Sequence, residues 1–290
     1  MVKYALFLGC LIPMRMPSVE IASRRVFERI GLESVDLKGY TCCPEPVFSR
    51  LIDETGQLVI SARNLALAEE LGLDIMTLCN GCYETLLETN ETLKNKSDEM
   101  LRVNRILENY GKKYRGLIKV KHAIEVLYED IGIEKIRECV TKPLKIRVAM
   151  HYGCHLYRDL SGDIMRKPRM MKEITSLTGV EIADYGLERL CCGYPSMQVD
   201  EEFSLTHRLL PKIKRMVEAG AEAVVLTCPA CTIQFETGQV LLRKRGIQYE
   251  IPCINIMELL ALSFGFSSRD IHLDLHRGPI LRLIKKVEGD

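Results

Sequence analysis

Ten of the twelve cysteines fall into two copies of one pattern. Each copy has a lone cysteine, then an adjacent pair, then a CxxC motif. Thirty-one residues separate the lone cysteine from the pair in the first copy and thirty-six in the second, but thirty-five lie between pair and CxxC in both. The duplication predicts two equivalent sites. The first set is Cys10, Cys42, Cys43, Cys79 and Cys82, and the second is Cys154, Cys191, Cys192, Cys228 and Cys231.

Cysteines at these spacings are typical of metal ligands. A CxxC at the start of a helix directs two sulfurs at one metal, and the helix N-terminus favours the thiolate that ligates it. Two further sulfurs would complete a tetrahedral zinc site or a four-thiolate iron–sulfur cluster. Five sulfurs suit one zinc ion poorly, so the prediction is a centre larger than a single ion, with a zinc knot as the alternative. The prolines at 46 and 195, with Gly193, permit the turn that would bring adjacent cysteines to one centre.

Other motifs narrow the chemistry. The ferredoxin run CxxCxxCxxxCP is absent, so cubane clusters for electron supply would lie on another chain. No GxGxxG or Walker A pattern follows a predicted strand, which leaves nucleotide binding unsupported. Cys139 and Cys253 have no counterpart in the repeat and are interpreted as buried free thiols.

Bulk composition excludes several function classes. Lysine and arginine total 40 against 39 for aspartate and glutamate, so no net charge favours nucleic acid or a membrane surface. No apolar run reaches the roughly 18 residues of a membrane span, and the N-terminal run is too short for a signal sequence. We therefore expect a cytoplasmic protein, in which thiols stay reduced and a disulfide scaffold is disfavoured.

The elements that must position the cysteines alternate between strand and helix. Apolar strands are predicted at residues 4–8 and 148–152, each followed by glycine and a lone cysteine, and at 74–78 and 223–227, each followed by a CxxC. Shorter strands at 34–37 and 180–183 precede the cysteine pairs. Helices are predicted at 18–30, 56–71, 168–178 and 201–219, with helices closing the first half at 92–142 and a strand and basic helix in the tail at 271–287.

This order predicts an α/β fold of two pseudo-twofold-related Rossmann-like halves, each with a parallel sheet and one five-cysteine site. The domains would be residues 1–142, a first cysteine-rich domain with a helical linker, and residues 143–290, the second. Four cysteines would end strands at the carboxyl edge of the sheets, where open α/β sheets place their sites.

The duplicated pattern, with Cys191-Cys192-Gly193 in its second copy, resembles the cysteine-rich CCG-domain family over nearly the whole chain. Within that family the chain is most similar to the B subunits of methanogen heterodisulfide reductases. The resemblance implies that each set holds one noncubane 4Fe-4S cluster and that the mixed disulfide of coenzyme M and coenzyme B is the substrate. It also implies two partners, a ferredoxin-like subunit with cubane 4Fe-4S clusters and a flavin-containing subunit. Pro44 departs from the family motif, where glycine is expected.

Disulfide reduction takes two electrons and an iron–sulfur cluster passes one, so a paired site would supply one electron from each set. The implied substrate is anionic, and four basic residues near the lone cysteines are candidates for anchoring it or for delivering protons: Arg15, His151, His155 and Arg158. Two alternatives remain open. One is an electron-transfer subunit of a hydroxyacid or glycerol-phosphate dehydrogenase complex, and the other is a zinc-stapled interaction protein.

Overall fold

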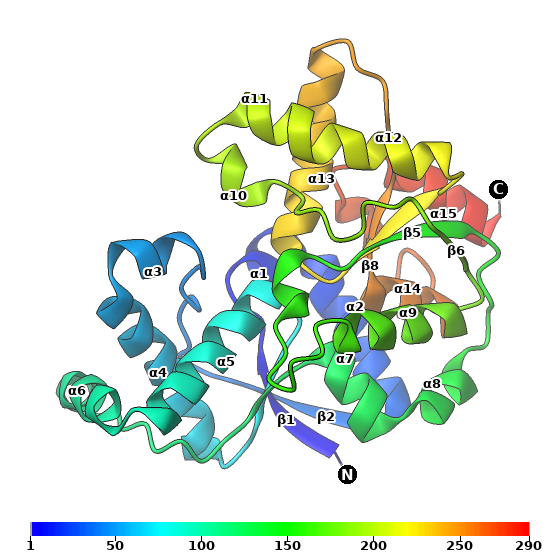
Figure 1. The fold of residues 1–290 in the computed structure, drawn as a ribbon. Coiled ribbons are helices and arrows are strands. Elements are labelled where there is room, and N and C mark those ends of the chain that lie inside the picture. Colours follow the sequence, from blue (N-terminus) through cyan, green and yellow to red (C-terminus); the bar gives the residue numbers. More distant parts are fainter. Residues whose placement is uncertain (1, 290) are drawn as a thin grey trace.

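The structure is a computed structural model that describes residues 2–289. Two four-stranded parallel sheets form its frame (Figure 1). The strand order is β2-β1-β3-β4 in the first sheet and β6-β5-β7-β8 in the second, so both halves have the same topology. The predicted α/β class with two similar halves is confirmed. The strands are β1 (Val2–Phe7), β2 (Leu32–Asp36), β3 (Ile75–Thr77), β4 (Val120–His122), β5 (Arg147–His151), β6 (Glu181–Ala183), β7 (Ala223–Leu226) and β8 (Cys253–Asn255).

The central strands are apolar because both of their faces are covered. In β1, Ala5, Leu6 and Phe7 are buried, and the strand pairs with β2 on one side and with β3 on the other. Strand β5 lies in the same way between β6 and β7. All of these pairings are parallel, so the chain leaves each strand at the same edge of its sheet. That edge is where the cysteines follow.

The helices between the strands agree with most of the predicted ranges. Helix α2 ends at Gly31, which takes the left-handed conformation (φ 76°) that glycine allows at a helix end. The helix predicted at 201–219 is a continuous helical stretch with a π-helical segment, Ser204–Leu209, in its middle. The principal helices are α1 (Leu11–Arg15), α2 (Pro17–Ile30), α3 (Phe48–Ile52), α4 (Glu54–Leu71), α5 (Asn80–Asn95), α6 (Ser97–Leu107), α9 (Arg166–Leu177), α10 (Tyr194–Met197), α11 (Glu201–Phe203), α12 (Leu210–Glu218) and α13 (Pro229–Lys244).

The prediction of helices throughout residues 92–142 was wrong in one respect. That segment contains β4, between α6 and two short helices, α7 (Ala123–Glu125) and α8 (Ile133–Cys139). Strand β4 has three residues and forms because it pairs with β3, with Val120 and His122 buried and Lys121 between them partly exposed. Strand β8, which no pattern predicted, pairs with β7 in the same way.

The tail was also predicted incorrectly in part. Residues 271–287 contain a 3-10 helix, Leu273–Leu275, and the predicted basic helix, α15 (Ile280–Glu288), but no strand. Ile271 and Leu273 are buried and alternate as in a strand. His272 between them takes a left-handed conformation, φ 52°, which curls the chain and prevents a strand.

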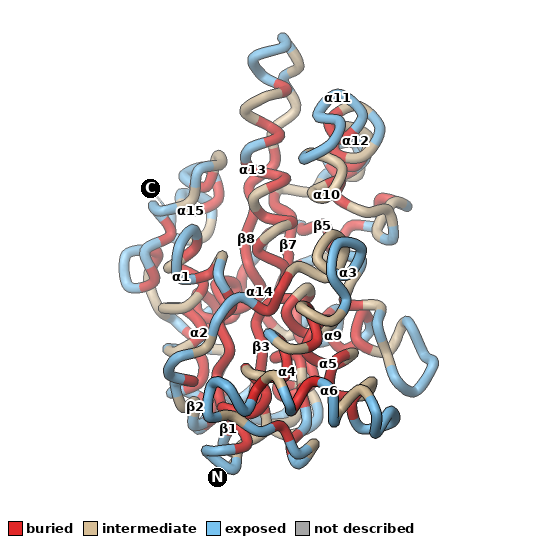
Figure 2. Tube along the Cα trace, turned by 90° about the vertical axis from the view of Figure 1, so that its left-hand side faces the viewer, coloured by how far each residue is buried: buried red, intermediate tan, exposed pale blue. Residues whose placement is uncertain are grey.

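The two halves share a core. Helix α14 (Ile256–Ser263) comes from the second half but packs against α2 of the first, and Figure 2 shows it in the buried middle of the molecule beside the strands. Both sheets contribute to one cluster of buried apolar side chains that includes Leu6, Val148 and Leu260. The boundary that we propose between residues 142 and 143 therefore separates two sheets with a common core. Among residues 2–289, no helix is both long and apolar enough to cross a membrane.

Candidate metal-cluster site

The two predicted cysteine sets come together in one place. Cys10 and Cys154 follow the central strands, while Cys79 and Cys228 are the N-cap residues of α5 and α13, which diverge from the middle of the molecule into opposite halves (Figure 1). Nine of the ten cysteines line a single cavity of about 230 Å³. The cysteines on this wall are Cys10, Cys42, Cys43, Cys79, Cys82, Cys154, Cys192, Cys228 and Cys231.

Hydrogen bonds between thiols connect the sulfurs in the same order in both sets. The lone cysteine contacts the first member of the pair, and the second member contacts the second cysteine of the CxxC. The two cysteines of each CxxC contact each other. A last contact joins Cys79 of the first set to Cys228 of the second. The halves therefore present two equivalent sulfur sets that meet at this pair.

These contacts separate the pKa values of neighbouring thiols. Hydrogen bonds from Cys154 and Cys192 lower the pKa of Cys191 to about 2, and those from Cys231 and Cys79 hold the pKa of Cys228 well below its usual value. The hydrogen bond to Cys228, together with burial, raises the pKa of Cys79. The sulfurs are therefore close enough for each thiol to shift the pKa of its neighbours, as expected of side chains that converge on one site.

The spacing of the sulfurs tests which metal centre fits. Tetrahedral zinc with bonds of about 2.3 Å holds its sulfurs roughly 3.8 Å apart. Within residues 2–289, one group of three potential ligands has its donor atoms within 4.8 Å of one another: His151, Cys192 and Cys231. The first set contains no such group among the described residues. This group offers two sulfurs and one imidazole, fewer than the four protein ligands of a structural zinc site.

Two glycines allow the chain to come this close to the sulfurs. Gly9 and Gly153 directly precede the lone cysteines, and both have left-handed φ angles, 68° and 77°. A Cβ on Gly9 would lie 2.6 Å from the sulfur of Cys82. A Cβ on Gly153 would lie 2.7 Å from Nδ2 of Asn80 and 3.6 Å from the sulfur of Cys231. Any side chain here would enter space that the ligands occupy.

Of the four basic candidates, His155 lines the cysteine cavity. It lies in a 3-10 helix, Cys154–Tyr157, and its Nδ1 hydrogen-bonds to the carboxylate of Glu84 on α5. Burial opposes a charge on the imidazole, but the hydrogen bond to Glu84 outweighs burial and raises the pKa of His155. The ion pair with Glu84 therefore favours the protonated imidazole at a position on the cavity wall.

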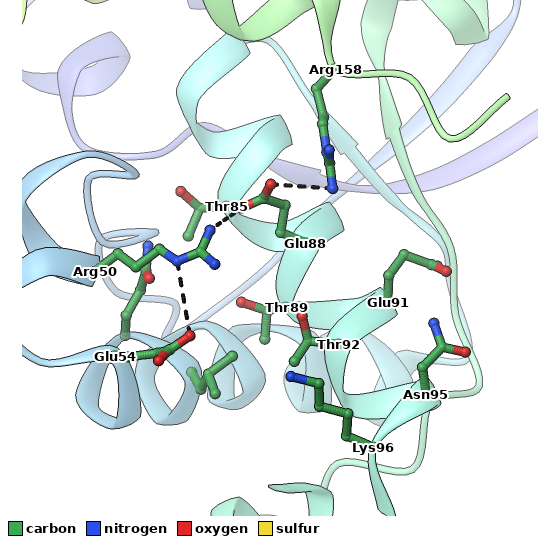
Figure 3. A pocket seen from close by; sticks show the side chains of 12 residues that line it. Arg50, Glu54, Thr85, Glu88, Thr89, Glu91, Thr92, Asn95, Lys96 and Arg158 are labelled. Atoms are coloured by element: carbon green, nitrogen blue, oxygen red, sulfur yellow. Dashed lines mark hydrogen bonds and ion pairs between the residues drawn. The ribbon is translucent and has the colours of Figure 1, made fainter. Parts of the chain in front are cut away.

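The other three candidates lie elsewhere. Arg158 is exposed and pairs with Glu88 at 3.3 Å, in a neighbouring pocket of about 280 Å³. Figure 3 shows the Glu88 carboxylate between Arg158 and Arg50. Arg15, at the end of α1, is exposed and is not among the residues that line the cavity.

His151 lies beneath the second sulfur set, not in the cavity. Its side chain ends β5, is 1% exposed and stacks at a tilt on Phe235, with ring centroids 5.3 Å apart. Neither ring nitrogen has a hydrogen-bond partner. Burial lowers the pKa of His151 to about 3, so the ring is neutral. An unpaired buried imidazole next to Cys192 and Cys231 is a further indication that a bound group belongs here.

Sequence reasoning missed the rest of the cavity wall. Glu45 and Tyr194 both line it, and each stands two residues after its cysteine pair. An alignment of the two repeats would have placed Glu45 and Tyr194 at equivalent positions. Glu45 also accepts hydrogen bonds from the backbone of Val47 and Phe48, which caps α3. The remaining wall is mainly apolar: Leu8, Leu11, Pro46, Gly81, Pro195, Pro229 and Ala230.

Residues 4–87 and 148–236 each match the model of the cysteine-rich domain known as CCG. The chain belongs to the CCG family. The two matches contain both sulfur sets completely, so each CCG repeat corresponds to one half of the site. The predicted family is confirmed.

Curated relatives match the CCG chain over nearly its full length. The B subunit of the ferredoxin:CoB-CoM heterodisulfide reductase of Methanosarcina mazei is 33% identical over 98% of this chain and 97% of its own. A protein of Archaeoglobus profundus, named as similar to the B subunit of heterodisulfide reductase, is 36% identical over 93% of each chain. An 8-methylmenaquinol:fumarate reductase membrane anchor subunit of Wolinella succinogenes is 25% identical over 94% of this chain and 95% of its own. Reductase subunits thus recur among the relatives, in keeping with an oxidoreductase role.

A solved structure shares the fold. The crystal structure of a hypothetical protein from Helicobacter pylori has a TM-score of 0.72 over 95% of this chain and 52% of that chain. Sequence identity is 18%, so the similarity supports the fold alone.

Proposed function

We propose that the chain is the catalytic iron–sulfur subunit of a heterodisulfide reductase. It would reduce the mixed disulfide of coenzyme M and coenzyme B to two thiols, with one noncubane 4Fe-4S cluster in each cysteine set. The observation that supports this best is that both sulfur sets face one cavity and meet at Cys79 and Cys228. The names of two relatives that cover nearly the whole chain support the substrate class.

The reaction takes up two electrons and two protons: the S–S bond breaks, and each sulfur leaves as a thiol. When bound, each cluster would supply one of the two electrons. In our proposal Cys10, Cys42, Cys43, Cys79 and Cys82 hold the first cluster, and Cys154, Cys191, Cys192, Cys228 and Cys231 hold the second.

The chain's own residues would bind the substrate and move protons. The apolar wall would exclude water from the disulfide and strengthen electrostatic interactions around it. His155, held by Glu84, would give a proton to a departing thiolate. Arg15 and Arg158 lie outside the sulfur sets and would attract the anionic arms of the substrate. His151 lies on the core side and would support the second set.

Electrons would come from partner chains. We propose a ferredoxin-like subunit with cubane clusters and a flavin-containing subunit, both implied by the family resemblance, and a cytoplasmic location. The relatives are named as subunits, which supports an assembly of several chains.

A second candidate is an electron-transfer subunit of another CCG-type oxidoreductase, such as a hydroxyacid or glycerol-phosphate dehydrogenase complex. The relative from Wolinella succinogenes, named for a fumarate reductase, favours this class. Such a subunit would pass electrons without binding a disulfide.

Metal analysis and a single-turnover assay test the proposal. Protein purified without oxygen is expected to carry about eight irons and as many acid-labile sulfides, since each of two clusters has four. The reduced protein should then convert the mixed disulfide to two thiols. Loading with zinc alone would contradict the cluster assignment. Clusters that transfer electrons but leave the disulfide intact would favour the second candidate.

A further inference from the structure

The side chain of Asn80 forms hydrogen bonds between the two halves within the site. Asn80 is the second residue of the first CxxC, the first residue of α5, and 0% exposed. Its Nδ2 donates to the backbone oxygen of Tyr152 at 2.7 Å, and its Oδ1 accepts from the hydroxyl of Thr227 at 2.8 Å. Both partners belong to the second half. Both of these side-chain hydrogen bonds of Asn80 therefore go to the opposite repeat.

Both partners, Tyr152 and Thr227, lie close to cysteines of the second sulfur set in the sequence. Thr227 directly precedes Cys228, and Tyr152 is separated from Cys154 by Gly153 alone. Gly153 packs so closely on Asn80 that a Cβ there would lie 2.7 Å from Nδ2. Displacing Asn80 would therefore move two ligands of the second set relative to the first.

The repeat itself does not require this amide. The equivalent position in the second CxxC is Pro229, which starts α13 but offers no side-chain hydrogen bond. A CxxC helix of this fold therefore forms without an asparagine at that place. The role of Asn80 therefore lies in joining the two halves, and only the first repeat supplies this amide. Asn80 directly follows Cys79, which contacts Cys228 of the second half.

We propose that Asn80 is a positioning residue that sets the separation and orientation of the two cluster sites. The inference rests on the proposed function, since it concerns two centres that serve one disulfide. Asn80 makes this contact through two buried hydrogen bonds, and a misplacement of about 1 Å in an active site can cost about a hundredfold in rate. Loss of Asn80 should thus weaken the cooperation of the clusters more than it weakens the fold.

A graded series of variants separates this role from a structural one. Thr227→Val removes one of the two hydrogen bonds, Asn80→Asp removes the donor to Tyr152, and Asn80→Ala removes both. Thr178→Val is a matched control, because the Thr178 hydroxyl is also buried but donates to the backbone oxygen of Thr175, in its own half, at 2.7 Å. Asn90→Ala is a second control, because the buried Asn90 amide bonds to Ile118 of its own half at 3.2 Å.

The readouts are iron content, the magnetic interaction between the two reduced clusters in EPR spectra, and turnover of the mixed disulfide. We expect full iron, a weaker interaction, and a kcat lowered about tenfold to a hundredfold at unchanged KM in the Asn80 variants, with a smaller effect in Thr227→Val. Both controls should resemble the unmodified chain.

Wild-type magnetic interaction and kcat in Asn80→Asp and Thr227→Val would overturn the proposal. If Asn80→Ala does not retain iron, the results for Asn80→Asp and Thr227→Val decide whether the proposal holds. An unmodified chain without iron would instead refute the proposed function, and iron analysis of that chain distinguishes the two failures.

Discussion

Gly9 offers a sharp test of the first sulfur set. We expect Gly9→Ala to remove the iron of the first cluster while the second keeps its own. The matched control is Gly31→Ala. Gly31 has a similar left-handed φ, 76° against 68° for Gly9, but a Cβ there would meet no atom within 4 Å.

The expected magnitude follows from these two geometries. A left-handed conformation costs a residue other than glycine roughly 1–2 kcal/mol, and both variants bear this cost. Gly9→Ala adds a Cβ at 2.6 Å from the sulfur of Cys82, about 1 Å inside an ordinary van der Waals contact. Cys82 is buried and lies at the start of α5, so its sulfur cannot move away without losing its place among the ligands. The difference in iron content and stability between Gly9→Ala and Gly31→Ala therefore measures the crowding at the Cys82 sulfur alone.

Iron and sulfide analysis of both variants, with urea unfolding of each, provides the measurement. Gly31→Ala should lose about 1 kcal/mol of stability and keep all of its iron, whereas Gly9→Ala should retain about half. Full iron and normal turnover in Gly9→Ala would refute the reasoning, because Cys82 would then not ligate at the position that the structure shows.

Three further predictions concern other groups. Cys43→Ser and Cys192→Ser should each abolish disulfide turnover, since both clusters are needed, while Cys253→Ser should keep iron and activity; turnover with one set disabled would contradict the two-centre reaction. His155→Gln should lower kcat with iron content unchanged, measured by steady-state kinetics, and unaltered kinetics would remove His155 from the site. Stability should depend on pH through His276, which lies buried between Glu236 and Glu258 at 2.7 and 3.0 Å. Although burial opposes its charge, the two carboxylates raise the pKa of His276 to about 10, against about 6.5 in an unfolded chain. Its contribution is complete below about pH 6.5 and is lost as pH rises toward 10, so the free energy of unfolding should fall over that window and His276→Gln should flatten the slope; an unchanged slope would contradict this assignment.

Several parts of the site could be predicted from the amino-acid sequence because local geometry controls them. A short apolar run that ends in glycine and cysteine forms a buried strand with a thiol at its edge, because strand and turn preferences act within a few residues. A CxxC at the start of a helix likewise has its geometry set by that helix. For this reason the two sulfur sets, the parallel sheets, the bounds of α2 and the start of α5 could be predicted from spacing.

The way in which the two sulfur sets meet depends on contacts between distant parts of the chain. The contacts of Cys79 with Cys228 and of Asn80 with Tyr152 join residues far apart in the chain, and no local pattern records which distant groups will be neighbours. Strands β4 and β8 have three residues each and exist because β3 and β7 lie beside them. Arg158 follows a cysteine in sequence but pairs with Glu88 of the other half. In each case the deciding energy comes from packing two halves together, and that term depends on the whole fold.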